Sequence, residues 1–416
     1  MTMTITTATT TAKRRLHGAL ASAAVLLAVA LAGCATPQAS RSTTPLPLDG
    51  IKIVDFTQVF MGPSCTQLLG DYGADIIKVE RPGAGDETRA WAPPVDPTGM
   101  ATYFASVNRN KRSLVRDLAD EGHRESVLEL ARTADVVVEN FRDGTMDRLG
   151  LGYERLSELN PRLVYCSITG FGTAGGRELP GFDLLVQAVG GLMSITGRRP
   201  DEPTKTGVAV VDVITGLHAV TGILTALIAR GETGPGQRVE VNLFSSLLSA
   251  LVNQASGYLG AGVVPGIIGN AHPSIAPYEV FETADRALVV AVGTDEQFVS
   301  FAAAIGMPDL GSDERFSVNS SRVAHRTELA ALITDRLATA GADHWFAAMA
   351  AHDVPAGPIN SIAEAFEFAE RLGLQPTVDV EGSTQVTNPI RMSRTPATYR
   401  SAPPRLGSAP TGDASV

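Results

Sequence analysis

The sequence predicts an α/β protein that has a large domain built on a parallel β-sheet and a smaller α+β domain after it. Two observations lead to this prediction. Short apolar runs that suit buried strands alternate with segments whose apolar residues recur at helical spacing, which is typical of a parallel sheet covered by helices. After about residue 260 the chain becomes rich in Gly and Pro and then changes character. Its length of 416 residues also favours two or more domains.

The predicted large domain covers residues 48–260. Its first strand lies at 51–56 and its first helix at 65–72, which Gly62 and Pro63 open, since proline suits the first turn of a helix. Further strands are predicted at 75–79, 135–139 and 163–167, and a further helix at 121–133. A β-rich run at 207–211 precedes an apolar helix at 214–228, which predicts another strand followed by a helix.

The predicted small domain covers residues 261–358. It contains one strand at 288–292 and helices at 296–305, 328–338 and 344–351. Residues 359–407 are expected to return to the large domain, and residues 408–416 are expected to form a disordered tail because they are short and polar.

The first 34 residues look like an export signal. Lys13, Arg14 and Arg15 precede an apolar run at 18–32 that ends in Leu-Ala-Gly-Cys, a sequence similar to a bacterial lipobox with Cys34 as the lipidated residue. Residues 35–47, rich in Thr, Ser and Pro, are expected to form a tether. The alternative is an appended segment outside the folded protein. The expected location of the folded part is the cytoplasm, and the alternative is a membrane anchor through Cys34.

Composition excludes several classes of partner. The formal net charge of −10 argues against a nucleic-acid surface. Three cysteines, Cys34, Cys65 and Cys166, are too few and too scattered for a disulfide framework or a zinc site, so no metal is expected. Contact with a membrane is expected only if the lipobox is used.

One acidic residue stands in an unusual setting. The stretch GVAVVDVITGLH places Asp212 among apolar and small residues, at or near the predicted strand-to-helix junction. Ligands bind in crevices at such junctions in open α/β folds. A buried acid without a nearby Lys or Arg is costly and is usually kept for chemistry, whereas the alternative is a helix N-cap. The rest of the chain favours chemistry.

Five segments carry a resemblance to a known family. They lie at residues 55–89, 108–113 (NRNKRS), 135–153, 179–197 and 207–227. Here the chain resembles the family III CoA-transferases, which include formyl-CoA transferase and the carnitine and bile-acid CoA-transferases. The resemblance covers roughly residues 45–407 and depends on the order and spacing of the segments. It implies a Rossmann-like large domain and an interlocked homodimer in which each chain threads through the other.

A CoA ligand agrees with the residues of these segments. Arg81, Lys111, Arg112, Arg142 and Arg148 supply cations for phosphates in an otherwise acidic chain, although 108–112 could equally be a solvated charged loop. Asn140 can bond an adenine edge and Phe141 can cover its face. The resemblance implies these CoA-contacting positions: Arg81, Asp117, Leu118, Asn140, Phe141, Arg142 and Arg148. CoA and acyl-CoA are thus expected as substrates, with no permanently bound cofactor.

The resemblance aligns Asp212 with the family's catalytic aspartate. It implies that CoA moves from an acyl-CoA to a carboxylic acid through an aspartyl anhydride and an aspartyl-CoA thioester. Asp183 is a candidate second acid or a structural cap on a helix at 184–189, and Gln187 is expected one turn further along the same face. His272 is a candidate substrate contact or a loop histidine with a structural bond. The segments GLMSITG, GVAVVD and HPSIAPYEVF are most similar to members that use succinyl-CoA and dicarboxylic acids.

Two alternative functions remain open. An α-methylacyl-CoA racemase of the same family needs two acid–base groups and places a His directly before the aspartate at the Asp183 position. Here that residue is Phe182, which cannot move a proton, and His218 is expected to pack in its helix. An envelope lipoprotein that keeps the fold as a binding module is the other alternative. The N-terminus favours this second alternative, and the presence of Asp212 opposes it.

Overall fold

The computed structural model describes residues 45–409 of the chain. The predicted signal segment with Cys34, nearly all of the predicted tether, and residues 410–416 lie outside the described residues.

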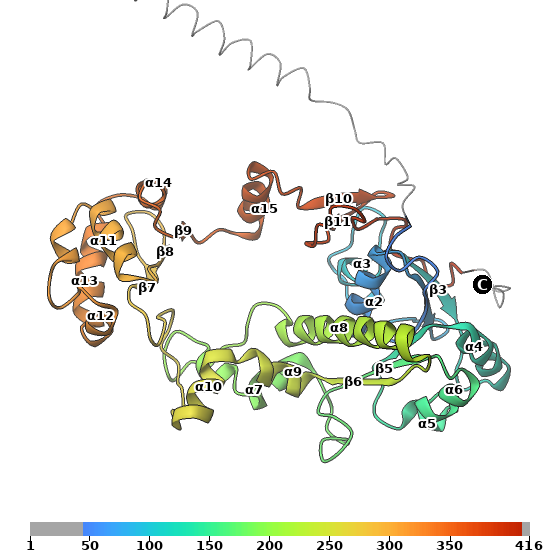
Figure 1. Ribbon diagram of the computed structural model, residues 1–416. Helices are drawn as coiled ribbons and strands as arrows, with labels where there is room; N and C mark the ends of the chain where they lie inside the picture. The colour runs from blue at the N-terminus through green and yellow to red at the C-terminus, as the bar shows by residue number, and fades with distance from the viewer. Residues whose placement is uncertain (1–44, 410–416) are drawn as a thin grey trace, which may run out of the picture. The chain divides into compact units, whose positions relative to one another are not determined.

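A six-stranded parallel sheet forms the main layer of the fold (Figure 1). Its strands are β1 (Lys52–Asp55), β2 (Asp75–Glu80), β3 (Lys111–Val115), β4 (Val136–Glu139), β5 (Val164–Thr169) and β6 (Arg238–Asn242). They lie in the order β3-β2-β1-β4-β5-β6, and every neighbouring pair is parallel. The order reverses between β1 and β4, and open α/β sheets bind ligands at the carboxyl ends of strands at such a reversal. The predicted parallel sheet is therefore confirmed.

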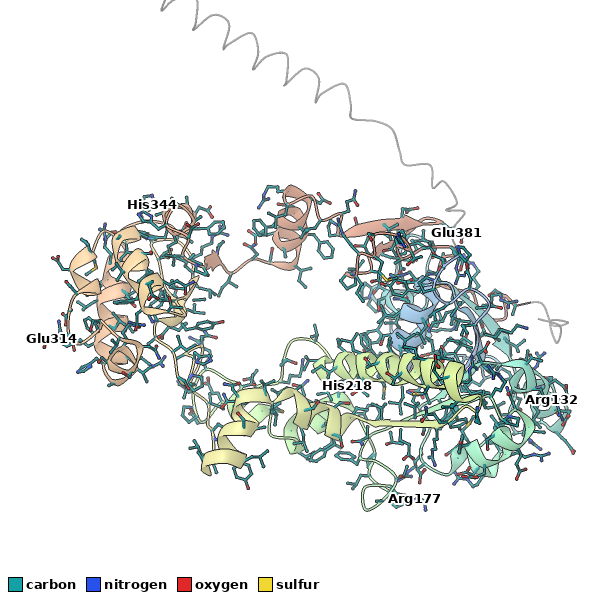
Figure 2. The ribbon with its side chains drawn as sticks, in the orientation of Figure 1. Arg132, Arg177, His218, Glu314, His344 and Glu381 are labelled. Atoms are coloured by element: carbon teal, nitrogen blue, oxygen red, sulfur yellow. The ribbon has the colours of Figure 1, made fainter. Side chains whose placement is uncertain are left out.

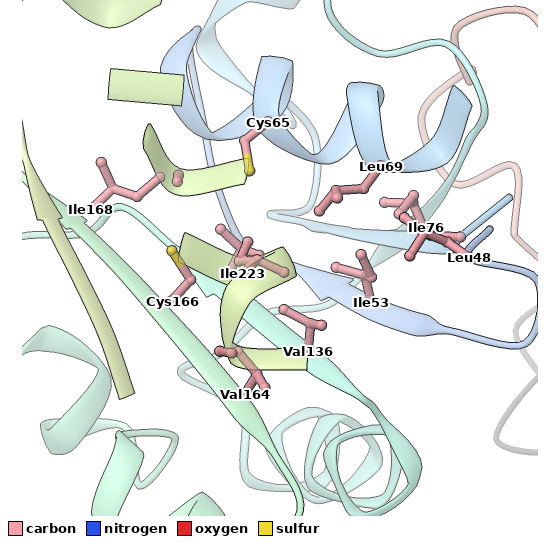
Figure 3. Packing of buried hydrophobic residues seen from close by; sticks show 14 of the residues in the cluster. Leu48, Ile53, Cys65, Leu69, Ile76, Val136, Val164, Cys166, Ile168 and Ile223 are labelled. Atoms are coloured by element: carbon pink, nitrogen blue, oxygen red, sulfur yellow. The ribbon is translucent and has the colours of Figure 1, made fainter. Parts of the chain in front are cut away.

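Alternate residues of the four central strands enter two different cores. Ile53 of β1 and Val136 of β4 pack in one core with α2 (Met61–Asp71) and α8 (Val210–Thr233). Val54 and Val137, the next residues along, pack in the other core with α4 (Glu121–Thr133) and α6 (Tyr153–Leu159). Successive strand side chains point to opposite faces, so a run of apolar residues marks a strand that helices cover on both sides. Figure 3 shows Cys65 of α2, Cys166 of β5 and Ile223 of α8 in the first core.

Shorter helices accompany the parallel sheet, and a second, antiparallel sheet with its own helices follows it in the chain. Shorter helices of the sheet-bearing part are α3 (Thr102–Ser106), α5 (Thr145–Arg148), α7 (Asp183–Val189), α9 (Leu243–Ala250) and α10 (Val252–Ala261). An antiparallel sheet in the order β7-β8-β9 follows, made of β7 (Tyr278–Phe281), β8 (Leu288–Ala291) and β9 (Ala356–Pro358). Its helices are α11 (Asp295–Ala304), α12 (Asn319–Ala324), α13 (Arg326–Leu337) and α14 (Ala342–Ala350). Helix α15 (Ile362–Arg371) and the hairpin of β10 (Thr377–Val380) and β11 (Ser383–Val386) come last.

The segment after β11 packs against α2 and the neighbouring strands. Arg400 donates through Nη2 to the carbonyls of Gly70 at 2.8 Å and Ala74 at 2.7 Å. The N–H of Ala409 donates to the carbonyl of Ser113 at 2.8 Å, and Ala409 is buried. The predicted disordered tail is therefore wrong for its first residues, because Ala409 is fixed against the edge strand β3.

Two other expectations about local structure are wrong, and two strands were not predicted. Residues 207–211 form no strand, because Gly207 and Val208 lie in an exposed loop and α8 already begins at Val210. Residues 108–112 are not a solvated loop, because Asn108 to Lys111 are buried and Lys111 starts β3. Strands β3 and β6 were missed because both lie at the edges of the sheet, where strands commonly carry charged residues that mask the apolar pattern.

Candidate active site

Asp212 lies in the first turn of α8, and it is not the N-cap. Its side chain is buried, with a relative exposure of 6% for the residue, and its Oδ1 has no hydrogen-bond partner among the described residues. Burial, and secondly the charge of Asp183, raise the pKa of Asp212 to about 7. A buried carboxyl that is left partly unpaired costs stability, and such groups are concentrated at functional sites.

Asp183 caps the helix of Asp212 rather than its own. It is the first residue of α7, and α7 has no side-chain cap at Phe182. Instead, Oδ1 of Asp183 accepts the N–H groups of Val211 at 2.8 Å and Asp212 at 3.2 Å, both in the first turn of α8. The expected cap on 184–189 is therefore wrong, because the carboxylate serves the free N–H groups of a different helix.

Gln187 extends this arrangement by one helical turn, as expected. Its Nε2 donates to Oδ2 of Asp183 at 2.5 Å, and its Oε1 accepts the N–H of Thr206 at 3.0 Å. Both carboxylate oxygens of Asp183 are thus occupied. Together Asp183 and Gln187 fix the loop that leads into α8 and the backbone that carries Asp212.

A cavity of about 350 Å³ surrounds Asp212 at the carboxyl ends of β1, β2 and β4, where the strand order reverses. It brings together these predicted residues: Arg81, Asn140, Phe141, Arg142, Asp183 and Asp212. Its wall also contains Phe182, which the sequence had set apart from the racemases, and these residues that the sequence reasoning did not select: Gln58, Val59, Met61, Glu87 and Gly181. The position of Gln58 and Val59 directly after the first predicted strand was the signal that could have revealed them.

Asn140 ties the loop after β4 to the loop after β1. Its Nδ2 donates to the carbonyl of Gln58 at 2.9 Å, and its Oδ1 accepts the N–H of Gln58 at 2.9 Å. The N–H of the next residue, Phe141, donates to Oε2 of Glu139 at 2.9 Å. The side chain of Asn140 therefore fixes the mouth of the crevice, in addition to any contact with an adenine.

The predicted cations fall into two groups. Arg81 donates through Nε to the carbonyl of Gly85 at 3.0 Å, and Arg142 donates to the carbonyl of Glu178 at 2.6 Å. Both line the cavity around Asp212. Arg148 is exposed and donates to Oγ1 of Thr145 at 3.0 Å, and it does not line that cavity.

Lys111 and Arg112 do not act as exposed clamps. Lys111 is buried and donates to Oδ2 of Asp55 at 3.2 Å and to the carbonyl of Pro63 at 2.8 Å. Burial lowers the pKa of Lys111 to about 8. Arg112 pairs with Asp75 on the adjacent strand at 2.7 Å. The expectation of a CoA contact from Lys111 is wrong, because its ammonium group is enclosed by protein acceptors.

Four other singled-out residues lie outside this cavity. Asp117 is exposed and accepts the N–H of Ala119, whereas Leu118 packs against the core beside α4. Nδ1 of His272 accepts the N–H of Ser274 at 3.1 Å, and its ring packs on Tyr278, as the structural alternative expected. His218 is exposed on α8 (Figure 2), where its Nδ1 lies 3.0 Å from Oγ of Ser246 on α9.

A second cavity, of about 590 Å³, adjoins the first. The two share Met61, Asn140, Phe141, Arg142, Gly181 and Phe182. The second cavity continues along the loop that joins β5 to α7, where Figure 2 shows Arg177, and Arg177 forms an ion pair with Asp143. A long ligand can therefore extend from Asp212 through one cavity into the other.

Known proteins match most of this chain. The sequence profile of CoA-transferase family III matches residues 48–409. Succinate–glutarate CoA-transferase of Agrobacterium fabrum is 42% identical over 372 residues, which cover 87% of this chain and 93% of that protein. Succinyl-CoA:glutarate CoA-transferase of Mus musculus is 40% identical over 370 residues, 87% of this chain and 84% of that protein. The solved structure of a CAIB/BAIF family protein from Brucella suis is 44% identical, with a TM-score of 0.79 over 88% of this chain and 97% of that one.

Proposed function

Because this chain belongs to CoA-transferase family III, we propose that Asp212 is the nucleophile with which it moves CoA from an acyl-CoA to a carboxylic acid. One observation carries the proposal. Asp212 is a buried carboxyl, and one of its oxygens finds no hydrogen-bond partner in residues 45–409. It lines a cavity at the reversal of strand order.

The reaction begins with two exchanges on the donor side. The carboxylate of Asp212 attacks the carbonyl carbon of the acyl-CoA, which expels CoA thiolate and leaves an acyl–aspartyl anhydride. The thiolate then attacks the aspartyl carbonyl of this anhydride, which releases the donor acid and leaves an aspartyl-CoA thioester. The acyl activation is therefore retained on the enzyme.

The acceptor acid takes CoA by the reverse steps. Its carboxylate attacks the aspartyl-CoA carbonyl and expels the thiolate again, which gives a second anhydride. The thiolate attacks the acceptor's carbonyl in that anhydride, which forms the new acyl-CoA and regenerates the carboxylate of Asp212. Water must stay out of the cavity, since it would hydrolyse either anhydride.

The raised pKa of Asp212 suits the role of a nucleophile, and it also sets the pH range in which the enzyme is expected to be active. The carboxylate is the nucleophile, so the group acts in its deprotonated form, which predominates above a pH of about 7. A carboxylate of higher pKa is the more basic nucleophile, and burial is the main cause of the shift.

The substrates we propose are succinyl-CoA as donor and glutarate, or a dicarboxylate of similar length, as acceptor. The names of the relatives from Agrobacterium fabrum and Mus musculus, at 42% and 40% identity, support this choice. Arg81 and Arg142 in the cavity supply positive charge for anionic groups of the substrates. Arg148, Asp117 and Leu118 remain proposed CoA contacts although they do not line this cavity, and His272 remains a proposed substrate contact.

Racemisation has less support from the same site. Phe182, at the position where the racemases are expected to have histidine, is 64% exposed at the mouth of both cavities and cannot exchange a proton. Both oxygens of Asp183 are held by hydrogen bonds. These observations favour transfer over abstraction of an α-proton.

We also propose the homodimer and the division into two domains. Helix α8 is the one helix of the described part of the chain that is long and apolar enough to cross a membrane, but its inner face packs on the sheet. Its outer residues Leu217 and Ile228 are exposed, as is Leu259 of α10. Exposed apolar side chains on these two helices favour an interface, and we propose that a second copy of the chain covers them. The separate core of residues 281–354 supports a distinct small domain.

We propose that the folded part works in the cytoplasm, where acyl-CoA is available, and that the N-terminal segment takes no part in the reaction. A chain that begins at Pro45 should then be dimeric in sedimentation equilibrium and as active as the full chain. A monomer with full activity would contradict the dimer, whereas an inactive or unfolded product would contradict the boundary. Lipid on Cys34 in mass spectrometry of the mature protein would contradict the cytoplasmic location and support the lipoprotein alternative.

Trapping the intermediate tests the nucleophile directly. During turnover with succinyl-CoA and glutarate, borohydride or hydroxylamine should modify Asp212, and peptide mass spectrometry should locate the label. The Asp212→Asn variant should bind CoA but show no transfer and no label. Normal transfer by this variant would refute the mechanism. Activity with other acids but not glutarate would refute only the choice of acceptor.

A further inference from the structure

The loop between β1 and α2 contains a backbone conformation that needs support. Val59 has a φ of 70°, in the left-handed region that β-branched residues rarely adopt. Together with Gln58, it lines the cavity around Asp212. Backbone strain of this kind persists only where the surroundings hold it, and it is concentrated at functional sites.

A buried ion pair lies against this loop from inside the protein. Nζ of Lys78 on β2 donates to the carbonyl of Thr57 at 2.6 Å, and the N–H of Val59 donates to both carboxylate oxygens of Asp86 at 3.3 Å. Lys78 and Asp86 pair with each other at 2.9 Å, and both side chains are completely buried. Burial acts to lower the pKa of Lys78, but the negative charges of Asp55 and Asp86 have the larger combined effect. The pKa of Lys78 is therefore raised overall, and Lys78 stays charged.

Further contacts hold the same loop, among them the N–H and the hydroxyl of Thr57, which both donate to Oδ1 of Asp55. Asn140 bonds both the N–H and the carbonyl of Gln58. A Cβ at Gly62 would lie 2.3 Å from Cβ of Thr57, so the glycine lets the start of α2 approach the loop. A Cβ at Gly216 would lie 2.8 Å from the carbonyl oxygen of Met61, so the end of the loop touches the helix of Asp212 about one turn beyond it.

We propose that Lys78 and Asp86 are positioning residues, and that their buried ion pair holds the Gln58–Val59 wall in the conformation that encloses Asp212 and keeps water from it. A buried ion pair is weak evidence for stability, because an apolar pair of similar volume is often as stable. The bonds from this pair to the backbone of Thr57 and Val59 give it a geometric role instead. The proposal rests on the proposed role of Asp212 as nucleophile.

The test neutralises both partners at once in the full chain. The double variant Lys78→Met/Asp86→Asn removes the donor to Thr57 without leaving one buried charge unpaired. With succinyl-CoA and glutarate, kcat should fall by about tenfold or more, since small misplacement of groups around a reacting centre has effects of this size. The ratio of succinyl-CoA hydrolysis to transfer should rise. The acid limb of the pH profile of kcat/KM reports the pKa of Asp212, which lies beside Asp183 and Tyr103. In the double variant water should reach this carboxylate and lower its pKa, so the acid limb should move to lower pH.

A matched control neutralises a different ion pair, which involves α8, the helix that carries Asp212. Arg230 and Asp135 pair at 2.8 Å near the C-terminal end of α8, far from Asp212. The variant Arg230→Met/Asp135→Asn should leave the hydrolysis ratio and the acid limb unchanged, even if it lowers the melting temperature. If both double variants change these readouts alike, the effect is general loosening and the proposal is wrong.

Two further measurements decide the proposal in every case. In a crystal structure of the double variant, Val59 should take a negative φ, and retention of its positive φ together with wild-type kinetics would overturn the proposal. If the double variant does not fold, Lys78→Gln/Asp86→Asn, which also leaves no buried charge unpaired and keeps a polar pair, must show the same changes in smaller degree, and wild-type values there would overturn the proposal. Failure of Asp212 to become labelled in the wild-type protein would refute the proposed nucleophile instead, so the two failures are distinct.

Discussion

Oδ1 of Asp183 accepts the backbone N–H of Asp212 at 3.2 Å, although the two residues belong to different helices. The same oxygen accepts the N–H of Val211, so a single carboxylate caps the first turn of α8 from outside. This arrangement places two acids close together, and the charge of Asp183 contributes to the raised pKa of Asp212. Asp183 therefore positions the proposed nucleophile and also adjusts its acidity.

The transfer rate should depend on pH through Asp212. Because its pKa is raised to about 7 and the carboxylate is the reactive form, kcat/KM should increase with pH and level off above about pH 8. Initial rates of glutaryl-CoA formation between pH 5 and 9 would measure this limb. A flat profile down to pH 5 would contradict a buried nucleophile with a raised pKa.

Replacing Asp212 should stabilise the protein at alkaline pH. The pKa rises from 3.8 to about 7 on folding, so between these values the folded state holds a proton that the unfolded chain has lost. The contribution of this group to stability therefore falls as the pH rises through that window. Urea unfolding should show Asp212→Asn to be more stable than wild type by up to about 4 kcal/mol at pH 8, with a smaller difference at pH 4.5. Equal stabilities at both values would contradict the shift.

Two substitutions at Asp183 separate its positioning role from acid–base catalysis. Asp183→Asn keeps an oxygen acceptor for the first turn of α8 and removes the charge, but its amide nitrogen cannot accept the bond from Nε2 of Gln187. A substantial part of kcat should therefore remain, and the acid limb should move to lower pH. Asp183→Ala removes the cap, so stability should fall by about 1 kcal/mol and kcat should fall as well. If the folded Asn variant loses transfer completely, Asp183 acts as the second acid instead.

The enzyme should not exchange α-protons. Phe182 is apolar, and the oxygens of Asp183 are bonded to Gln187 and to the backbone of α8. A 2-methylacyl-CoA incubated with the enzyme in deuterated water should therefore gain no deuterium at the α-carbon, as mass spectrometry would show. Rapid exchange that disappears in Asp183→Ala would instead support the racemase alternative.

The sequence by itself determined the parallel α/β architecture, because the two faces of a covered sheet require apolar residues along every central strand. Strands β1, β4 and β5 follow that requirement and were predicted, as was helix α4. The sequence also singled out Asp212, since an acid among apolar residues is rare enough to be informative.

Only the tertiary structure decided which polar groups meet. The charged strand β3 resembles a surface loop in sequence, yet its Lys111 is buried because Asp55 and Pro63, far away along the chain, supply its acceptors. The cap that Asp183 provides to α8 and the pair of Lys78 and Asp86 beneath Val59 likewise join separate elements. Local sequence patterns predict secondary structure and burial over a few residues. Hydrogen bonds and ion pairs between distant segments depend instead on how the helices and strands pack in space.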